Sequence, residues 1–249
     1  MKDFTLNIYR EFLDTLISRR FRFQPYAEFI QSPFPQVVIL RHDVDARKEN
    51  SLEFAKIQHE KSIRGTYYFR MVPQSFDKGV IREIASMGHE IGYHYETMDV
   101  TGGDIDKAYN EFCKNLEILR ELAPIQTICM HGSPRSPHDN RLLWEKYGYR
   151  DLGIIGEPYL DTDFEEVGYL TDTGRRWNGS SVSIRDKVSG KHIFNFRNTQ
   201  EIIEQVDKLP ARMMFTFHPQ RWSDHPVAWT RELIMQNVKN QVKRFLIKK

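Results

Sequence analysis

The chain has 249 residues, 40% of them hydrophobic and 12% aromatic, so it can bury a sizeable core as one large domain or two small ones. Its 36 basic and 34 acidic residues give a formal net charge of +2, and no strong field favours nucleic acid or a membrane surface as a partner. The composition favours a small or extended polar partner.

Neither the cysteines nor the hydropathy indicate export. Cys113 and Cys129 form no disulfide-rich pattern, which suits a reducing compartment. The N-terminal MKDFTLNIYREF has early acidic residues and no continuous apolar stretch, unlike a secretory signal. No apolar segment approaches the roughly 20 residues that span a bilayer. We therefore expect a soluble, cytoplasmic protein without a transmembrane segment.

The first predicted element is an amphipathic helix over residues 4–19, where apolar residues recur at helical spacing. We expect residues 1–35 to form a helical extension packed on the main fold. Alternating elements follow, with strands predicted at 36–45, 65–70, 89–96 and 126–131 and helices at 49–63, 76–87, 104–122 and 140–147.

The alternation is interrupted in the second half of the chain. A strand is predicted near 151–155, and residues 156–192 are predicted to form loops and short hairpins. A strand at 193–197, a helix at 199–208, a strand at 212–218 and a helix at 226–247 follow. Repeated βα units imply parallel strands joined by crossovers. The sequence therefore predicts one α/β domain over residues 1–249, a (β/α) barrel of about seven parallel strands.

Polar side chains stand at the ends of several predicted strands. They are Asp43 and Asp45 on the first, His94 and Glu96 on the third, His131 on the fourth and His218 on the last. In a parallel barrel these strand ends meet on one rim, where such folds build active sites. A lone strand-end histidine is more often structural, but four strand ends with ligand-type groups favour a functional rim.

The motif RHDVD at residues 41–45 ends a run of apolar residues. Asp43 and Asp45 are two residues apart on a strand, so their side chains point the same way, as does that of Arg41. Two carboxylates on one face are costly unless a cation lies near them, and a divalent metal ion would supply it. The alternative is that one aspartate caps the next helix and the other forms a salt bridge. The motif alone leaves both readings open.

The chain resembles the polysaccharide deacetylases, the superfamily with the NodB-homology fold. RHDVD at 41–45 looks like the first motif of that family, GHEIGYHYE at 88–96 like the second and FTFHP at 215–219 like the last. MHGSPRSPHDN at 130–140 and DTGRRW at 172–177 are similar to a branch associated with O-antigen and capsule synthesis. The resemblance implies a distorted (β/α) barrel with a divalent metal ion, usually zinc.

The resemblance also implies residue roles. Asp43 would be the general base, Asp45 a metal ligand, His94 the first metal histidine and His218 the general acid. The family's second metal histidine lies four residues beyond the first, where this chain has Met98, a poor ligand for such ions.

The departure at Met98 requires a third ligand from elsewhere. His131, which ends the adjacent strand, is the first substitute, and Glu96, on the same strand face as His94, is the second. The family's third motif supplies an arginine that orients the base, and here Arg41 or Arg135 is expected to replace it. Arg41, Glu96 and Arg135 are also expected to contact the substrate.

Two clusters of arginine and tryptophan lie outside these motif positions. They are Arg175, Arg176 and Trp177 in the irregular region, and Arg221 and Trp222 after the last strand. Arginine suits phosphates and carboxylates, whereas an indole face suits a sugar ring. The alternative is solvated loop charge and a packed tryptophan. Together the clusters favour an anionic glycoside, such as a nucleotide-sugar or a lipid-linked sugar phosphate.

The leading hypothesis is a metal-dependent hydrolase that removes an N-acetyl or similar acyl group from a sugar during synthesis of a surface polysaccharide. A second hypothesis keeps the barrel but makes it a deformylase or an amidohydrolase for a non-sugar amide, possibly without metal. The third is an inactive homologue that binds a glycan. Met98 keeps the latter two open, and the retained acidic and histidine residues favour the first.

Overall fold

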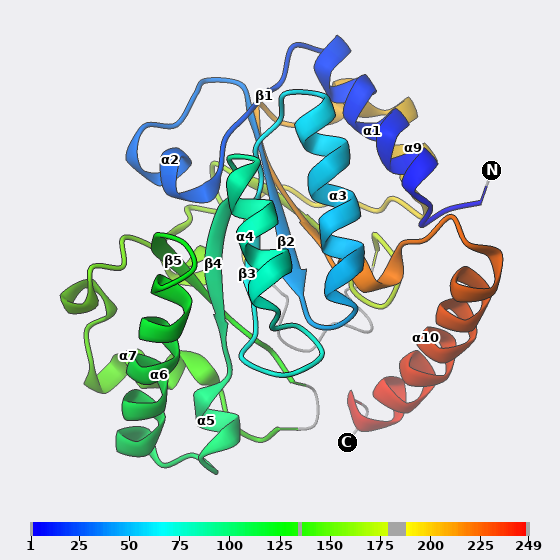
Figure 1. The fold of residues 1–249 in the computed structure, drawn as a ribbon. Helices are drawn as coiled ribbons and strands as arrows, with labels where there is room; N and C mark the ends of the chain where they lie inside the picture. The colour runs from blue at the N-terminus through cyan, green and yellow to red at the C-terminus, as the bar shows by residue number, and fades with distance from the viewer. Residues whose placement is uncertain (1, 134–135, 179–187, 248–249) are drawn as a thin grey trace.

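The computed structural model describes residues 2–133, 136–178 and 188–247 and shows a parallel β-sheet surrounded by helices (Figure 1). Its seven strands pair in the order β5-β4-β3-β2-β7-β6, with β1 paired to β2. All these pairings are parallel. The strands are β1 (Arg22–Phe23), β2 (Val37–Val44), β3 (Thr66–Phe69), β4 (Glu90–Tyr95), β5 (Ile125–Met130), β6 (Gly168–Thr171) and β7 (Arg212–Phe217). The predicted α/β fold with about seven parallel strands is confirmed.

Two of the predicted strands are wrong, although their number is right. Near 151–155 the chain forms the 3-10 turn Tyr149–Leu152, and only Gly156 bridges to Thr127 of β5. Residues 193–197 have no regular structure, and Ile193 is 91% exposed, so no sheet covers it. The sheet instead contains two short strands that were not predicted, β1 beside β2 and β6 beside β7.

Helices cover the outer face of the sheet, and α3, α4 and α6 lie over β2, β3 and β4 (Figure 1). Several begin with a side-chain cap: Thr5 accepts the Ile8 N–H at α1, and Asp104 accepts the Lys107 N–H at α6. The helices are α1 (Leu6–Ser18), α2 (Tyr26–Gln31), α3 (Lys48–Glu60), α4 (Lys78–Ser86), α5 (Thr97–Val100), α6 (Ile105–Arg120), α7 (Leu143–Lys146), α8 (Pro158–Asp161), α9 (Thr199–Glu204) and α10 (Pro226–Ile247).

Alternation along β2 separates an apolar outer face from an inner face of mixed character. Leu40 and Val44 pack into the large core cluster under the helices, whereas Ile39 packs into a second cluster inside the barrel. Arg41 and Asp43 continue the inner face toward the carboxyl end of the strand. The inside of the barrel is therefore apolar toward the amino ends of the strands and charged toward their carboxyl ends.

The short helix α2 lies against the amino end of the barrel. The backbone N–H of Tyr26 donates to Thr66 Oγ1 at 2.8 Å, and that of Ala27 donates to Glu90 Oε2 at 3.0 Å. Thr66 and Glu90 are the first residues of β3 and β4. These bonds place α2 at the amino ends of β3 and β4.

A loop segment fills the gap between β5 and β6, which form no pairing with each other in the described part of the chain. Glu157 accepts the backbone N–H of Met130 at 2.9 Å, which ties the segment to β5. The Tyr159 hydroxyl lies 3.4 Å from that of Tyr169 on β6 and accepts Arg41 Nη2 at 3.1 Å. The barrel is therefore distorted, because an isolated backbone bridge to β5 and side-chain contacts to β6 span this gap in place of a paired strand.

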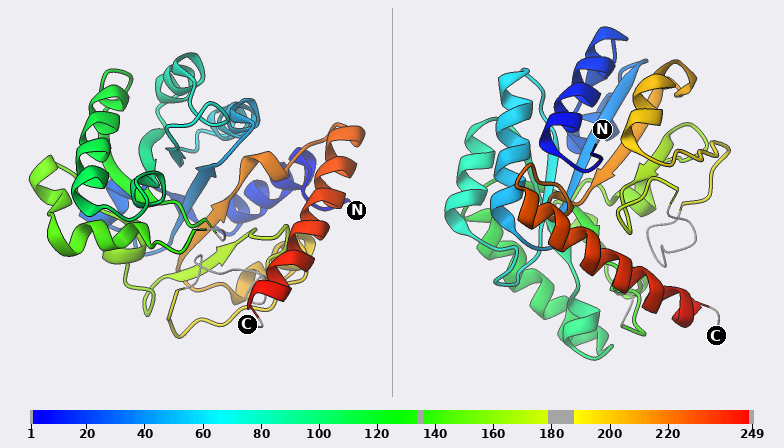
Figure 2. Two further views of the ribbon diagram at one scale, coloured as in Figure 1. Left: turned by 90° about the horizontal axis from the view of Figure 1, so that it is seen from below. Right: turned by 90° about the vertical axis from the view of Figure 1, so that its right-hand side faces the viewer.

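The last helix, α10, lies on the rim side of the molecule. The left view of Figure 2, which looks onto the carboxyl ends of the strands, shows it along one edge of the fold. Arg47, which follows β2, pairs with Glu232 of α10 at 3.1 Å. Within the described residues no helix is long and apolar enough to cross a bilayer.

Candidate active site

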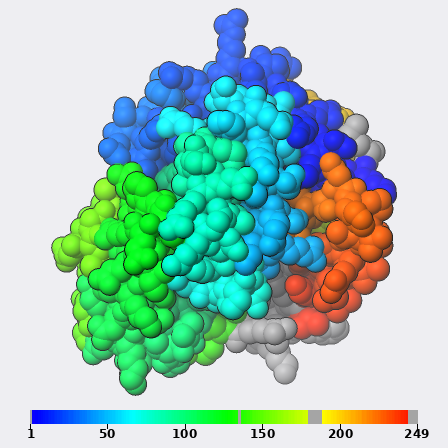
Figure 3. All heavy atoms as spheres, in the orientation of Figure 1, coloured from blue at the N-terminus to red at the C-terminus, as the bar shows by residue number. Residues whose placement is uncertain are grey.

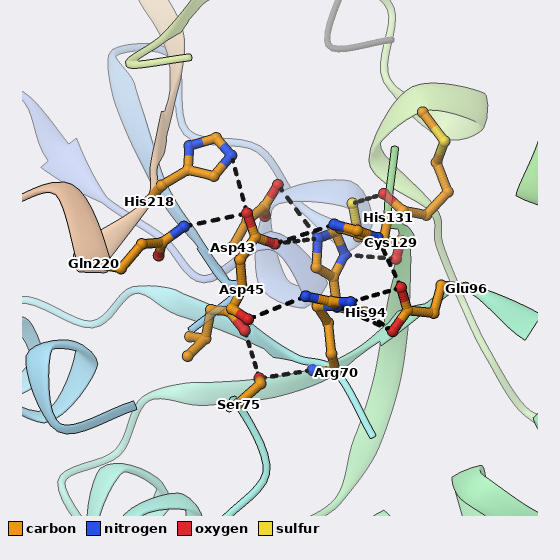
Figure 4. A network of polar contacts seen from close by, with 12 residues as sticks. Asp43, Asp45, Arg70, Ser75, His94, Glu96, Cys129, His131, His218 and Gln220 are labelled. Carbon is orange, nitrogen blue, oxygen red and sulfur yellow. Dashed lines mark hydrogen bonds and ion pairs between the residues drawn. The ribbon is translucent and has the colours of Figure 1, made fainter. Parts of the chain in front are cut away.

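The strand-end residues predicted to be functional meet at the carboxyl rim (Figure 4). Asp45 is at the centre: its Oδ1 lies 3.5 Å from His94 Nε2 and 3.6 Å from His131 Nε2, and its Oδ2 lies 3.9 Å from His218 Nε2. Asp43 Oδ2 lies 3.8 Å from His94 Nε2. The sheet thus brings together five side chains that are up to 175 residues apart in sequence.

A hydrogen bond on its far side sets the tautomer of His94. His94 Nδ1 lies 2.9 Å from the backbone carbonyl of Cys129, which can only accept, so Nδ1 carries a proton. His131 Nδ1 lies 2.9 Å from Glu96 Oε2, an ion-pair contact that lacks hydrogen-bond geometry. Nε2 of both rings faces Asp45.

Asp45 Oδ1 is buried and accepts no hydrogen bond from the described residues. Three electron-pair donors, this oxygen and the two Nε2 atoms, converge without a donor between them, an arrangement that a cation would stabilise. Ligands about 2.1 Å from a tetrahedral zinc ion lie about 3.4 Å apart, close to the two distances from Asp45 Oδ1, 3.5 and 3.6 Å. These two contacts and the unpartnered oxygen of Asp45 suit a divalent cation.

A second layer of contacts fixes the orientation of His131. Arg70 Nη2 donates to both Glu96 oxygens, at 2.8 and 2.7 Å, and Arg70 Nη1 donates to the Asp45 carbonyl at 3.1 Å. The bonds of Arg70 and His131 outweigh burial and lower the pKa of Glu96 to about 2, so it stays ionised. Carboxylate–histidine pairs of this kind commonly orient metal ligands. Glu96, which was predicted to contact substrate, instead contacts Arg70 and His131 in this structure.

Two other groups of ligand-type side chains lie nearby. Atoms of Asp43, His94 and Cys129 lie within 4.8 Å of one another, as do atoms of Glu96, Asp99 and His131. Arginines already engage Asp43 and Glu96 through both oxygens, and Ser136 and Asn140 donate to Asp99. Asp45, His94 and His131 do not form one of these two compact groups, and the unpartnered oxygen of Asp45 is what makes them the candidate set.

Asp43 is held by Arg41 of the same strand. Arg41 Nε donates to Asp43 Oδ1 at 2.8 Å and Nη2 to Oδ2 at 2.6 Å, and both side chains are buried. Burial opposes ionisation of Asp43, but the charges of Arg41 and His94 outweigh it and lower the pKa of this carboxyl. Arg41, one of the two arginines expected to orient this carboxylate, therefore holds both of its oxygens.

His218 is held by Asp172, a residue at the end of β6. Its Nδ1 lies 2.6 Å from Asp172 Oδ1 and its backbone N–H donates to Oδ2 at 3.0 Å. Arg221 Nη1 and Trp222 Nε1 donate to the same carboxylate at 2.7 and 2.6 Å. Burial raises the pKa of Asp172, but the charges of His218 and Arg221 lower it more, so this carboxyl is an ionised anchor. The ring of His218 is thereby fixed with Nε2 toward the site.

Most of the predicted substrate-binding residues have buried, structural positions. Arg221 and Trp222 support Asp172, and the Trp222 ring is 1% exposed. Trp177 is 3% exposed and donates to Thr199 Oγ1 at 2.9 Å, so its face is covered. Neither indole can stack on a sugar, because neighbouring aromatic rings pack against both.

The arginines of the irregular region differ in their placement. Arg175 lies between the rings of Phe4 and Trp229 and donates to the Trp229 carbonyl at 3.0 Å, so packing accounts for it. Arg176 is half-buried. Arg135 falls outside the described residues.

Met98 and the supporting residues show where the sequence is insufficient. Met98 is 4% exposed and packs in the main core cluster, so it does not enter the site. Arg70, Asp172 and Gln220, whose Nε2 donates to Asp45 Oδ2 at 3.1 Å, were not predicted. Their signal was their position one to three residues beyond a strand end, the same signal that identified the histidines.

Comparison with known proteins gives few matches. No protein-family model matches the chain, and no curated protein matches it significantly. Similar solved structures include a CE4 family pseudoenzyme from Bacillus anthracis, 12% identical over 85% of this chain and 62% of that one, with a TM-score of 0.46. A mutant of that pseudoenzyme with restored enzymatic activity aligns equally well. This chain spans less than two thirds of the length of those two proteins, 62% and 64%.

Two other solved structures are covered more completely. PdaA of Bacillus subtilis, a family 4 carbohydrate esterase, is 12% identical over 91% of this chain and 83% of its own, with a TM-score of 0.42. The Xyl-CE4 domain of a multidomain xylanase from the hindgut metagenome of Trinervitermes trinervoides is 10% identical over 84% and 85%, with a TM-score of 0.42. These structural neighbours are CE4 family carbohydrate esterases, at an identity too low to assign an activity.

Proposed function

We propose that the protein is a metal-dependent hydrolase that removes an N-acetyl group, or a similar acyl group, from a sugar. The observation that carries the proposal is the convergence of Asp45 Oδ1, His94 Nε2 and His131 Nε2, none with a hydrogen-bond donor between them, beside two further acid–base groups. An inactive glycan-binding protein would need none of the supporting contacts that hold these groups in place.

Asp45, His94 and His131 would hold the metal ion, with zinc the first choice because its sites favour imidazole and carboxylate ligands. A bound ion of this kind polarises the acyl carbonyl and lowers the pKa of water from about 16 toward about 7. His94 is almost fully buried, whereas the side chain of Asp45 is 22% exposed, so the site opens to solvent on the Asp45 side. Substrate would enter from that side.

Asp43 is the proposed general base. Its lowered pKa keeps it a carboxylate at neutral pH, and the two bonds from Arg41 fix its oxygens. In that geometry it would accept the proton of the attacking water. Arg41 positions the base and does not touch the substrate, since its side chain is 1% exposed.

His218 is the proposed general acid. The bond from Nδ1 to Asp172 orients the ring so that Nε2 faces the site, 3.9 Å from Asp45 Oδ2. From there it would donate a proton to the departing nitrogen. That step is necessary because an amide anion is a very poor leaving group, and general acid catalysis typically contributes about 10²- to 10⁴-fold.

The choice of a sugar rests on the motifs RHDVD, GHEIGYHYE and FTFHP. A cytoplasmic role in O-antigen or capsule synthesis, with a nucleotide-linked or lipid-linked anionic sugar, is the finer part of the proposal. The same five acid–base and ligand positions would serve the hydrolysis of a formamide.

The test is amine release from N-acetylated and N-formylated sugars by the zinc-loaded protein and its variants. Asp43→Asn should retain zinc and lose at least about 100-fold in kcat. Asp45→Asn should lose both zinc and activity. Lys107→Ala, a change at a side chain that is 75% exposed on α6, is the matched control and should behave as the wild type. Full turnover by Asp43→Asn on a confirmed substrate would contradict the assignment.

A further inference from the structure

The C-terminal helix α10 has the reverse of the usual polarity for a helix that packs on a protein. Its buried face is polar: Glu232, Gln236 and Asn240 are 8%, 5% and 6% exposed. Asn240 Nδ2 donates to the Gly174 carbonyl at 2.8 Å, and Gln236 Nε2 donates to Asn240 Oδ1 at 2.9 Å. Polar bonds rather than apolar packing therefore hold this face to the body.

The opposite face of α10 is apolar and exposed. Its members are Val227 at 70% exposed, Ile234 at 58%, Met235 at 47%, Val238 at 57% and Val242 at 54%. Their spacing of three, four, seven or eight residues places most of them on one stripe along the helix. A shallow groove beside the start of the stripe is lined by Pro226, Thr230 and Arg231 together with three stripe residues. An exposed apolar stripe of this length is typical of an interaction surface.

The charges beside the stripe are all positive over residues 226–242. Arg231 and Lys239 are exposed, whereas Glu232, the only acidic residue in that range, is buried and pairs with Arg47 at 3.1 Å. Within residues 226–242 of α10, the exposed charges beside the stripe are therefore cations, and the nearest acidic residue before the helix is the exposed Asp224. A second copy of the helix would bring like charges together, which disfavours self-association.

The helix α10 lies beside the rim, with the stripe on the side that faces away from the body. Figure 3 shows α10, in orange to red, at the surface of the molecule, and its buried face contacts Arg47 after β2 and Gly174 after β6. Both of these residues follow the carboxyl end of a strand. A surface docked on the stripe would therefore be separated from the rim by the width of α10.

We propose that the outer face of α10 docks on an anionic lipid surface, with Ile234 and Val238 inserted at the headgroup boundary and Arg231 and Lys239 facing the lipid charges. A basic amphipathic helix lies in the interface in this way, and each basic residue near an anionic surface contributes about fivefold in partitioning. The docked protein would hold its rim beside that surface, separated from it by the width of α10. The inference goes beyond the proposed hydrolase and does not depend on turnover.

The experiment is co-sedimentation of the full chain with vesicles of phosphatidylcholine and phosphatidylglycerol, and with vesicles of phosphatidylcholine alone. Wild type should bind the mixed vesicles, and binding should weaken as salt is raised. Ile234→Ser combined with Val238→Ser should reduce partitioning about tenfold or more, as should Arg231→Glu combined with Lys239→Glu. Val100→Ser, at an apolar side chain that is 66% exposed elsewhere, is the matched control and should bind as the wild type.

The possible results separate the occupants of this surface. All the substituted side chains are exposed, so each variant is expected to fold. Circular dichroism of each variant checks this first. Equal binding to both vesicle types, or binding unchanged by the stripe variant, would overturn the proposal. So would a dimer in sedimentation velocity that the stripe variant abolishes without any vesicle binding, because the stripe would then cover a second copy. These outcomes are independent of hydrolysis, so failure of the proposed activity would leave them interpretable.

Discussion

Each candidate catalytic group depends on one charged partner that sets its direction. Arg41 fixes Asp43, Asp172 fixes His218 and Glu96 fixes His131. Breaking such a buried pair leaves an uncompensated charge and usually costs several kcal/mol. Activity and stability should therefore respond together when a partner is removed.

Asp172→Asn tests the positioning of His218. The amide keeps the size of the side chain but presents an NH₂ group to donors, so the bonds from His218, Arg221 and Trp222 cannot all persist. We expect kcat to fall by about 100-fold or more and the alkaline limb of the pH–rate profile to move, while zinc content is retained. An unchanged pH–rate profile would show that Asp172 has only a structural role. Asp139→Asn, at a rim-side carboxylate that pairs with Arg141, is the control.

A buried histidine outside the site should make stability depend on pH. His89 Nδ1 accepts the Gly65 N–H at 3.1 Å and Nε2 lies 3.0 Å from the Ala55 carbonyl, a pair of bonds that the neutral ring satisfies. Burial, aided by the charges of His59 and Arg64, lowers the pKa of His89 to about 4. The lowered pKa stabilises the fold above the unfolded value of about 6.5, and this contribution is lost as pH falls toward 4.

The expected loss from His89 is roughly 2 to 3 kcal/mol between pH 6.5 and 4, measured by urea unfolding. His89→Asn should lower stability at pH 7.5 and flatten the dependence over that range, whereas His192→Asn should keep the wild-type slope. If His89→Asn retained that slope, another group would be responsible.

Residue-level prediction from sequence succeeded where the signal was local and failed where it was spatial. The alternation of a strand was enough to place Asp43 and Asp45 on one face beside Arg41. Asp172 was missed because it follows β6, whose four residues give too short a pattern to recognise. Trp177 and Trp222 were assigned to ligand binding because a tryptophan in a loop gives no sign of whether the body covers it.

At the scale of elements, the register of β3, β4 and β5 depends on the close approach of Tyr68 to Gly92. A Cβ at Gly92 would overlap the Tyr68 ring and lie 3.0 Å from the Thr127 carbonyl. The Tyr68 hydroxyl lies 3.0 Å from Thr127 Oγ1, so the ring is held on both sides. Because Gly92 and His94 share one face of β4, any shift there displaces a candidate metal ligand.

Gly92→Ala should destabilise the fold by about 1 to 3 kcal/mol and weaken zinc binding, as measured by chemical unfolding and metal titration. Gly79→Ala is the control, since its Cβ would meet only Asp77 Oδ1 at 3.2 Å in the first turn of α4. It should be close to neutral. A Gly92→Ala variant with wild-type stability would show that Tyr68 can move without cost.

Elements with strong periodicity were predicted within a few residues, and short ones were not. The strand and helix boundaries from 36 to 131 agree with β2 through β5, because buried strands and amphipathic helices alternate there. The two wrong strands, 151–155 and 193–197, contain apolar residues, but only the Ile155 N–H of the first range bonds to the sheet, at Gln126 of β5, and neither range forms a strand. β1, with two residues, carries no pattern that sequence could reveal.

At the scale of the whole molecule, a barrel with an apolar lower interior supports a charged rim. The near-zero net charge of +2 gave no sign of a lipid surface, because the proposed docking charges on α10 are balanced by acids elsewhere in the chain. The net charge of the whole chain therefore gives no information about the exposed cations and apolar stripe on one face of α10. Fold class is readable from alternation, and His131 could be proposed from its strand end, whereas the supporting contacts of Arg70 and Asp172 and the outer face of α10 required three-dimensional contacts.

The central claim is that Asp45, His94 and His131 hold a divalent metal ion. The most direct test is elemental analysis of the purified protein after incubation with zinc and removal of excess metal, together with thermal unfolding of the same samples. The account predicts near-stoichiometric zinc and a raised Tm for the wild type, both lost in His131→Ala and both kept in His192→Ala. Stoichiometric zinc that survives in His131→Ala, or no zinc in the wild type, would contradict it.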